Sequence, residues 1–358
     1  MKKGFIKVCL ALAVPLSAAQ AQAAGESGLD SLNSSVKTVT GKTAPAASKP
    51  GGAKPATSGC SKSAKYNFGG AYFRKLVTHE DPAIVGIQAE GTLPLIAFDE
   101  ARYYTDTEGN DYKTGPLDRP SVYTGASSPS NELDCGLGWD RVYLSTRTAV
   151  MVAPDGGHYQ LALDKSVLFG PDGGKLASGS AAVTAMESSL KLKPLMAFRP
   201  FWRTTGMEKP DWHNPPLGAK NNIYFYPGER IKMALNYIGG GKFRLYVSAQ
   251  GRDFSVTFAQ KGFERTRSFK RINSIDQFRL ENGKRVGNEG HDVVPTKTRV
   301  TGASWSTTSI LLGSGAAVPF SGTHCVEQRG RDTNARYSEI FRSSGWTPAG
   351  GETLDITP

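Results

Sequence analysis

The sequence predicts an all-β body folded as a two-sheet antiparallel sandwich with few short helices. Apolar and polar residues alternate with period two between Asn221 and Phe258. From Tyr66 onward, clusters of Gly, Pro, Asn and Asp interrupt the chain about every ten to fifteen residues, and no strand–helix alternation is present. Strands with one apolar face hide it by stacking as two sheets or closing into a barrel. The size of the body favours a jelly-roll sandwich over a small barrel.

Residues 1–23 are predicted to be a cleavable secretory signal. Lys2, Lys3 and Lys7 precede the apolar run 8–16, and small residues with the A-x-A cleavage pattern follow it. The run is too short to span a bilayer, and no later stretch is long and apolar enough. We therefore expect an exported protein, periplasmic or extracellular, without a transmembrane segment.

Residues 24–62 are rich in Ala, Ser, Pro and Lys and have almost no large apolar side chains, so we expect a disordered spacer. More than half of the formal charge of +11 lies in the first 65 residues. Such a basic segment can contact anionic polymers of the cell envelope, or it can be a solvated linker. No nucleic-acid motif accompanies it, so a nucleic-acid partner is not expected. No feature of the sequence fixes the oligomeric state.

The remaining residues, 63–350, are assigned to one large β-sandwich body, and the sequence leaves open whether 66–130 belong to the sandwich or form an appended lobe. Within the body, residues 222–226 end at a Pro-Gly turn. The runs 230–237, 243–248 and 254–258 alternate and are separated by glycines, which predicts a three-stranded meander.

Residues 141–153 and 158–169 are predicted to form a hairpin. The sequence Pro-Asp-Gly-Gly follows each of these two runs, at 154–157 and at 171–174. This is turn chemistry and not a phosphate loop, because a strand and not a helix follows the first copy. The best helix candidate in the body is 178–192.

Three cysteines remain after the signal: Cys60, Cys135 and Cys325. An oxidising compartment permits one disulfide and one thiol, and three pairings are open. We favour Cys60–Cys325, which would join the start of the body to its last part, and we expect Cys135 to be a buried thiol in an apolar strand. The histidines and cysteines lack metal-ligand spacing, so no metal and no cofactor are expected.

Four runs in the body follow one another in a set order: Leu133–Trp139, Phe198–Arg203, Tyr226–Ile231 and Phe269–Gln277. This succession resembles that of YrpD-like exported bacterial proteins, within the wider concanavalin A-like sandwich group. The resemblance covers roughly residues 131–306, and the chain departs from it in the segment 66–130 and in the tail after Ile310. It implies a sandwich fold and export, but no established activity. The wider group includes lectins and glycan-cleaving enzymes, which implies a face able to hold a sugar chain.

Sugar recognition needs aromatic surfaces and planar hydrogen-bonding side chains, because a pyranose has an apolar face and a rim of hydroxyls. A glycan or an anionic envelope polymer is the expected ligand. The alternative for each candidate residue is a structural role in the core or in a loop. The candidates are Trp139, Trp202, Arg203, Trp212, Asp276, Gln277 and Asn288.

A hydrolase is the second hypothesis, and for it Glu132, Asp134 and Glu289 are the fallback catalytic acids. Glu132 and Asp134 are two residues apart in one strand and therefore point the same way. They partly match the E-x-D-x-x-E pattern of some sandwich glucanases, but Leu137 occupies the third acidic position. Gln277 with Glu289 or Glu132 would instead suggest a peptide-cleaving glutamine/glutamate pair. We assign no catalytic residue, and favour a binding protein over an enzyme; a structural protein without a small-ligand site is the third hypothesis.

Overall fold

The structure, a computed structural model, describes residues 70–106, 113–129, 131–205, 212–217, 223–265, 267–288, 291–320, 325–329 and 340–358. The predicted signal, the spacer and Cys60 lie outside these ranges. No helix in the described ranges has both the length and the apolar character needed to cross a membrane.

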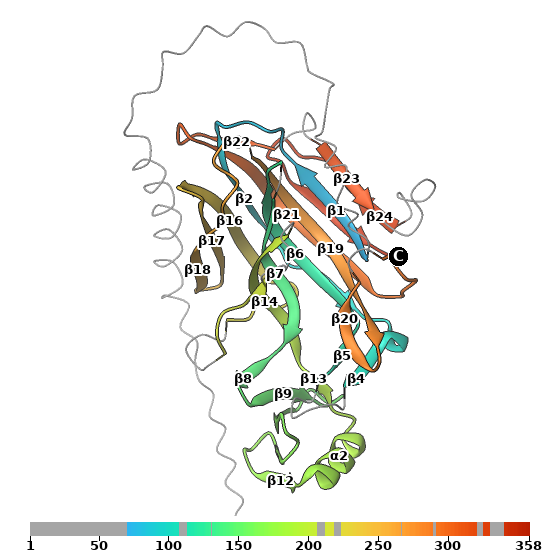
Figure 1. The fold of residues 1–358 in the computed structure, drawn as a ribbon. Coiled ribbons are helices and arrows are strands. Elements are labelled where there is room, and N and C mark those ends of the chain that lie inside the picture. The colour runs from blue at the N-terminus through green and yellow to red at the C-terminus, as the bar shows by residue number, and fades with distance from the viewer. Residues whose placement is uncertain are drawn as a thin grey trace, which may run out of the picture.

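One sheet, here called sheet I, pairs its strands in the order β15-β14-β7-β6-β19-β1-β23, with β20 added to β19 (Figure 1). All its pairings are antiparallel. In chain order the strands are β1 (Ala71–Val77), β6 (Asp118–Ser127), β7 (Glu132–Arg141), β14 (Met196–Thr205), β15 (Trp212–His213), β19 (Ser268–Glu281), β20 (Lys284–Gly287) and β23 (Cys325–Arg329).

The opposing sheet, sheet II, has the order β18-β17-β16-β2-β21-β25-β24, and both β3 and β22 pair with β21. The predicted meander is confirmed as β16, β17 and β18. The strands are β2 (Ile84–Thr92), β3 (Leu95–Ala97), β16 (Arg230–Gly239), β17 (Lys242–Ala249), β18 (Arg252–Ala259), β21 (Arg299–Leu312), β22 (Ala317–Pro319), β24 (Phe341–Ser343) and β25 (Glu352–Ile356).

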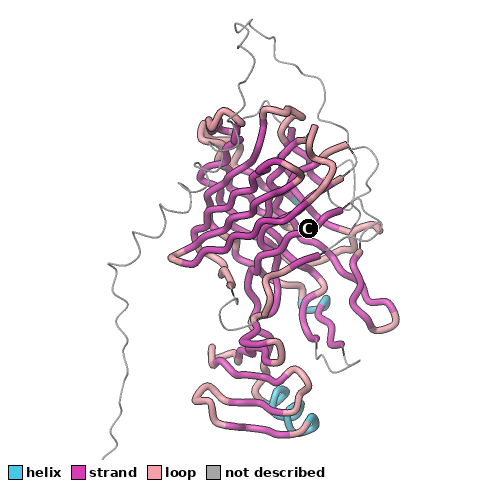
Figure 2. Tube along the Cα trace, turned by 60° about the vertical axis from the view of Figure 1, so that its left-hand side comes forward, coloured by secondary structure: helices cyan, strands magenta, loops and turns pink. Residues whose placement is uncertain are grey.

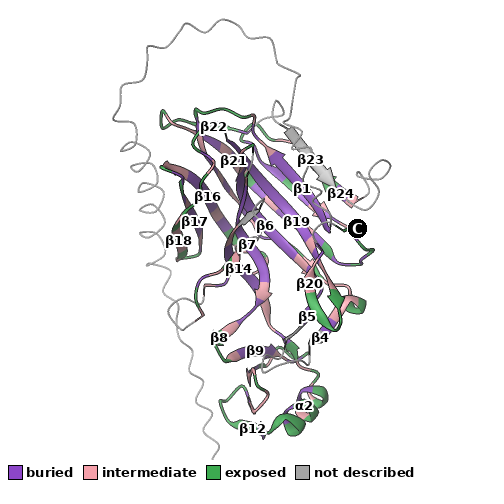
Figure 3. Ribbon diagram, in the orientation of Figure 1, coloured by how far each residue is buried: buried purple, intermediate pink, exposed green. Residues whose placement is uncertain are grey.

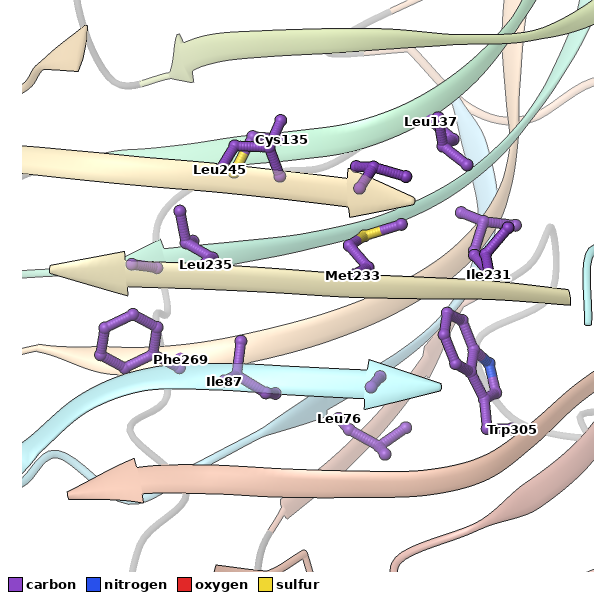
Figure 4. Close-up of a cluster of buried hydrophobic side chains, with 14 of the residues drawn as sticks. Leu76, Ile87, Cys135, Leu137, Ile231, Met233, Leu235, Leu245, Phe269 and Trp305 are labelled. Atoms are coloured by element: carbon purple, nitrogen blue, oxygen red, sulfur yellow. The ribbon is translucent and has the colours of Figure 1, made fainter. Parts of the chain in front are cut away.

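Apolar side chains from the facing rows of the two sheets fill the space between them. Leu137 and Cys135 of sheet I meet Leu235, Leu245 and Met233 of sheet II (Figure 4). Cys135 is a free, buried thiol, as predicted. The predicted fold class is thus confirmed: an all-β, two-sheet antiparallel sandwich of jelly-roll type. Burial of these rows is the main source of its stability.

A smaller lobe extends from one end of the sandwich (Figures 1 and 2). Its sheet has the order β12-β11-β10-β9-β13, with β8 on β9, and one helix packs on it through Val183. The helix α2 (Ser180–Ser189) confirms the helix predicted within 178–192. The lobe strands are β8 (Tyr143–Ser145), β9 (Thr148–Val152), β10 (His158–Ala162), β11 (Val167–Phe169), β12 (Lys175–Ser178) and β13 (Lys193–Pro194).

The hairpin predicted over 141–153 and 158–169 is wrong in detail, because each run is broken by a turn. Ser145 Oγ accepts a hydrogen bond from the Arg147 amide between β8 and β9. Between β10 and β11, Asp164 accepts one from the Ser166 amide, and Lys165 adopts a positive φ of 55°. Short side-chain acceptors of this kind compete with the ladder and end strands.

Other boundaries also shift. The 222–226 run forms only one bridge, Phe225 with Phe198, in its described part. Strand β2 lies in sheet II, and β1 and β6 lie in sheet I, so these described parts of the segment 66–130 belong to the sandwich. The sandwich also continues past residue 350, because β25 pairs with β21. A short ribbon, β4 (Tyr103–Asp106) with β5 (Lys113–Pro116), follows the 3-10 turn η1 (Glu100–Arg102).

A buried ionic group joins the inner faces of the two sheets. Glu352 of β25 accepts hydrogen bonds from Arg271 of β19 at 2.7 Å and from Arg74 of β1 at 2.6 Å. The Arg271 guanidinium also lies over the Trp305 ring, with Cζ 4.6 Å from its centroid. Burial lowers the pKa of Arg271, and the Glu352 carboxylate opposes that shift. Two cations therefore share one buried counter-charge.

Replacing Glu352 with Gln should destabilise the protein strongly, because two guanidiniums would remain buried without a counter-charge. We expect the free energy of unfolding to fall by about 3 kcal/mol or more. Urea unfolding measures it, with the exposed Glu80→Gln as the matched control. A loss no larger than that of the control would contradict this account.

Candidate binding site

Sheet I has an inner face against sheet II and an outer face that points away from it. Leu133, Cys135 and Leu137 of β7 belong to the core between the sheets. Because side chains alternate along a strand, Asp134 and Asp140 of β7 point to the outer face. The central strands of this sheet are buried along most of their length (Figure 3).

The strand register places three charged residues side by side on this outer face. Asp276 of β19 is directly opposite Arg119 of β6. The β6–β7 register, which pairs Ser121 with Gly138, places Arg119 opposite Asp140 when continued by two residues. Neighbouring strands lie about 4.8 Å apart, so the backbones that carry the two carboxyls are separated by about 10 Å.

Glycines let long charged side chains lie flat across these strands. A Cβ added to Gly138 would be 3.2 Å from Arg119 Nε, and one added to Gly125 would be 2.5 Å from Lys270 Cε. Glycine inside a strand commonly marks such a close approach. Arg119 Nε crosses to donate to the Trp139 carbonyl at 2.8 Å on β7.

A pocket of about 370 Å³ opens at the end of this face that carries Asp276. The side chain of Trp212 is stacked on Phe201, with ring centroids 4.6 Å apart. The guanidinium carbons of Arg119 and Arg203 lie 4.5 Å and 5.2 Å from the Trp212 centroid, so the indole positions both cations. The pocket is lined by Gly70, Ala71, Arg119, Asp140, Arg203, Trp212, Asn214, Asp276, Gln277, Phe278 and Arg285.

Hydrogen bonds fix the Trp212 loop against the sheet. Trp212 Nε1 donates to Asn214 Oδ1 at 2.8 Å, and Asn214 Nδ2 donates to the Pro200 carbonyl at 2.8 Å. Arg199 pairs with Asp140 at 3.2 Å on the same side. The wall of the pocket is therefore built before any ligand arrives, which reduces the entropy lost on binding.

Asp276 is the titratable group of the pocket with the raised pKa. Burial raises the pKa of its carboxyl, and the charge of Arg203 and hydrogen bonds from Ser121 and Ser274 only partly oppose this. Perturbed acids in concave sites are candidates for a functional role.

A compact ionic cluster, defined here as Glu132, Asp134, Lys270 and Arg203, lies farther along the same face. Lys270 Nζ is 2.8 Å from Asp134 Oδ1 and 3.4 Å from Glu132 Oε2. Arg203 Nε is 3.4 Å from Asp134 Oδ2. Burial alone would raise the pKa of Asp134, but Lys270 and Arg203 together hold it below its usual value.

Four of the predicted ligand residues meet in the pocket: Arg203, Trp212, Asp276 and Gln277. The Gln277 amide is also used structurally, since Nε2 donates to the Val294 carbonyl and Oε1 accepts from the Val294 amide. These four residues come from three strands of sheet I: β14, β15 and β19.

The other three predicted ligand residues do not line the pocket. Trp139 is a core residue, with its ring 4.9 Å from that of Phe198. Trp202 packs against the core and stacks on His213. Asn288 is buried and donates to the Asp292 carbonyl, so it holds a loop. Both tryptophans are on the inner side of their strands, which is why they pack rather than bind.

Sequence reasoning missed Arg119, Asp140 and Arg285, whereas Asn214 lies in the loop 212–216 that the sequence suggests as a contact element. When the partners of a strand are unknown, its arginines and aspartates are most simply interpreted as solvent-exposed side chains. The sequence did contain one indication. Gly136 and Gly138 are two residues apart in one strand, and glycines in a strand indicate that another group lies close to its surface.

The acids considered for a hydrolase, Glu132, Asp134 and Glu289, do not form a catalytic pair among the described residues. Glu132 and Asp134 do share a face, but both are ion-pair partners of Lys270. A lowered pKa at Asp134 is the opposite of what a general acid needs. Glu289, Cys60 and the Cys325 side chain lie outside the described residues, so that disulfide stays a prediction. Within the described ranges, no group of three His, Cys, Asp or Glu side chains could hold a metal ion.

A second hollow, of about 430 Å³, lies on the outer face of sheet II. Its charged residues include Glu90 and Lys232, which pair at 3.3 Å while their side chains remain 45% and 44% exposed. Exposed pairs of this kind are well solvated and weakly coupled. The pocket on sheet I is the better candidate, because its charges converge in partly buried surroundings.

No family model matches the chain, and no curated protein matches it. Among solved structures it is similar to a scytalido-glutamic peptidase bound to a peptide-based transition state analogue, with 9% identity and a TM-score of 0.38 over 81% of this chain and 98% of that one.

Two further structures are similar at lower scores. SCP-B, an eqolisin-family peptidase in complex with the tripeptide Ala-Ile-His, has 10% identity and a TM-score of 0.36 over 81% of this chain and 98% of its own. A β-porphyranase from the human gut bacterium Bacteroides plebeius has 9% identity and a TM-score of 0.15 over 59% and 54%. Scores this low do not identify an activity.

Asp276→Asn should change the pH dependence of stability. A raised pKa means that the folded state binds the proton more tightly, so wild-type stability falls as pH rises from the unfolded-state pKa through the folded-state pKa. The variant should be more stable than wild type in urea at about pH 7 and equal at about pH 3, below both pKa values. The exposed Asp253→Asn should show no such difference; equal curves for all three proteins would refute the assignment.

Proposed function

We propose that this protein is exported and binds an acidic polysaccharide through the pocket on the outer face of sheet I. The carrying observation is that Arg119, Arg203 and Arg285 converge on a pocket that holds only two carboxyls, those of Asp140 and Asp276. Asp140 already has Arg199 as a partner. Arg203 likewise contacts Asp134. Several guanidinium groups on one wall favour a ligand with carboxylates, which planar arginines bind in a bidentate manner.

The chemistry of the wall supports a sugar. Asn214 and Asp276 supply planar polar groups among the arginines, and Phe278 and Trp212 supply apolar surface. Pockets of a few hundred Å³ with convergent polar groups are typical of small-ligand sites. A uronic acid residue within a polysaccharide combines the hydroxyls and the carboxylate that this set would recognise.

Binding of purified protein to a polyuronate, compared with a neutral glucan, tests the proposal. Arg285 is exposed at the pocket rim, with Cζ 4.6 Å from the Phe278 centroid, so Arg285→Gln removes a charge with little effect on the core. Losing one charge-assisted hydrogen bond should weaken polyuronate binding about tenfold. Binding should also weaken with salt.

The matched control is Arg265→Gln, which changes another exposed arginine that is not among the residues lining the pocket. It should leave the affinity unchanged. Equal affinity for polyuronate and neutral glucan, or equal losses in the two variants, would refute the proposed ligand class.

A hydrolase acting on the same polymer is the second candidate function, and one observation favours it. Asp276, with its raised pKa, lies across Arg119 from Asp140, which is held by Arg199. A carboxyl with a raised pKa that faces a second carboxyl, on backbones about 10 Å apart, resembles the acid and base pair of inverting glycosidases. Release of reducing ends by wild type but not by Asp276→Asn would support cleavage; binding without release would leave the binding role alone.

A further inference from the structure

The innermost part of the ionic cluster brings an amine and a carboxylate into contact away from solvent. Lys270 Nζ lies 2.8 Å from Asp134 Oδ1, and the two side chains are 1% and 0% exposed. Glu132, at 7% exposure, lies 3.4 Å from the same nitrogen. Such seclusion is unusual for three ionisable side chains of a sheet face.

Asp134 and Lys270 come from strands that are not neighbours in sheet I. Asp134 of β7 and Lys270 of β19 both lie opposite Gly125 of the intervening β6. The lysine side chain passes directly over that glycine, where any Cβ would be 2.5 Å from its Cε. The glycine at position 125 therefore leaves room for the Lys270 side chain to cross β6.

We propose that Lys270 and Asp134 condense to an intramolecular amide that joins β19 to β7 across β6. The ammonium and the carboxylate together hold all the atoms of one amide and one water molecule, so no oxidant, reductant or activating group is required. The bond between Asp134 Cγ and one carboxylate oxygen breaks, a bond between Cγ and Lys270 Nζ forms, and both charges disappear.

Glu132 is placed to move the proton. It takes one proton from the Lys270 ammonium, which frees the nitrogen lone pair to attack Asp134 Cγ, and it delivers that proton to the departing oxygen. A second proton passes from the same nitrogen to that oxygen, which leaves as water. Lys270 Nζ is in contact with both carboxylates, at 3.4 Å from Glu132 and 2.8 Å from Asp134, so the groups of this step converge on one nitrogen.

Arg203 assists the attack of the Lys270 amine from the opposite side of the Asp134 carboxyl. Its Nε is 3.4 Å from Asp134 Oδ2, where negative charge builds up as the nitrogen adds to the carboxyl carbon. A fixed cation at that position in a secluded site stabilises the tetrahedral intermediate.

Two physical factors drive a condensation that bulk water opposes. Fixing the amine against the carboxyl replaces a bimolecular encounter by an effective molarity of about 10⁵ M or more. Forming a neutral amide also replaces two buried charges by an uncharged group that needs no counter-charge. With water largely excluded, the reverse hydrolysis is slow.

Peptide mapping of the purified full mature protein tests the proposal directly. Trypsin does not cut at an acylated lysine, so the cross-linked protein should give a branched peptide joining residues 114–141 to residues 268–271, lighter by one water than the sum of its parts. The intact mass should likewise be one water below the sequence mass. A wild-type map with cleavage after Lys270 and no branched peptide would overturn the proposal.

Three variants separate the chemistry from folding. Lys270→Arg keeps the charge but loses the amine, and Glu132→Gln keeps both reacting groups but loses the proton carrier; each should show the uncondensed mass. Lys232→Arg, on the outer face of sheet II, should retain the branched peptide. A Glu132→Gln protein that is as fully cross-linked as wild type would exclude the role given to Glu132.

Discussion

The central constraint of this sandwich is that long charged side chains must lie flat across sheet I, and they can do so only where a strand has no Cβ. Lys270 crosses β6 over Gly125, and Arg119 lies over Gly138 of β7. Both crossings connect cations of one strand to acceptors on another. The glycines are thus as necessary to the ionic arrangement as the charges themselves.

This constraint explains why charge is buried on both faces of one strand. Lys270 and Arg271 are consecutive in β19 and point to opposite faces, one toward Asp134 and the other toward Glu352. Each is 1% exposed at its side chain. The two pairs join β19 to β7 on the outer side and to β25 of sheet II on the inner side. A single strand therefore links the polar face and the interior of the sandwich.

The local patterns of the sequence predicted the meander, the helix α2 and the buried Cys135 thiol, because each depends on residues close together in the chain. The register of β6 with β19 depends on partners more than a hundred residues apart, and no local pattern contains it. Trp139 was the avoidable error: it shares its parity with Leu133, Cys135 and Leu137, which already places it on the apolar side.

Long-range strand pairing also explains which residues of the pocket could be predicted from the sequence. Arg119 and Asp276 become neighbours only through strand pairing, while Arg203, Trp212 and Gln277 were found as residue types suited to a polar ligand. Long-range pairing thus decides which of the chemically suitable residues meet.

The most direct measurement of the central claim is the stability of Gly125→Ala against Gly115→Ala in urea. The added methyl at 125 would lie 2.2 Å from the Leu133 carbonyl oxygen and 2.5 Å from Lys270 Cε, whereas a methyl at 115 has no neighbour within 4 Å. Gly125→Ala should lose about 2 kcal/mol or more through overpacking, and Gly115→Ala should lose almost nothing. Equal stabilities of the two variants would contradict the view that these glycines hold the charged face together.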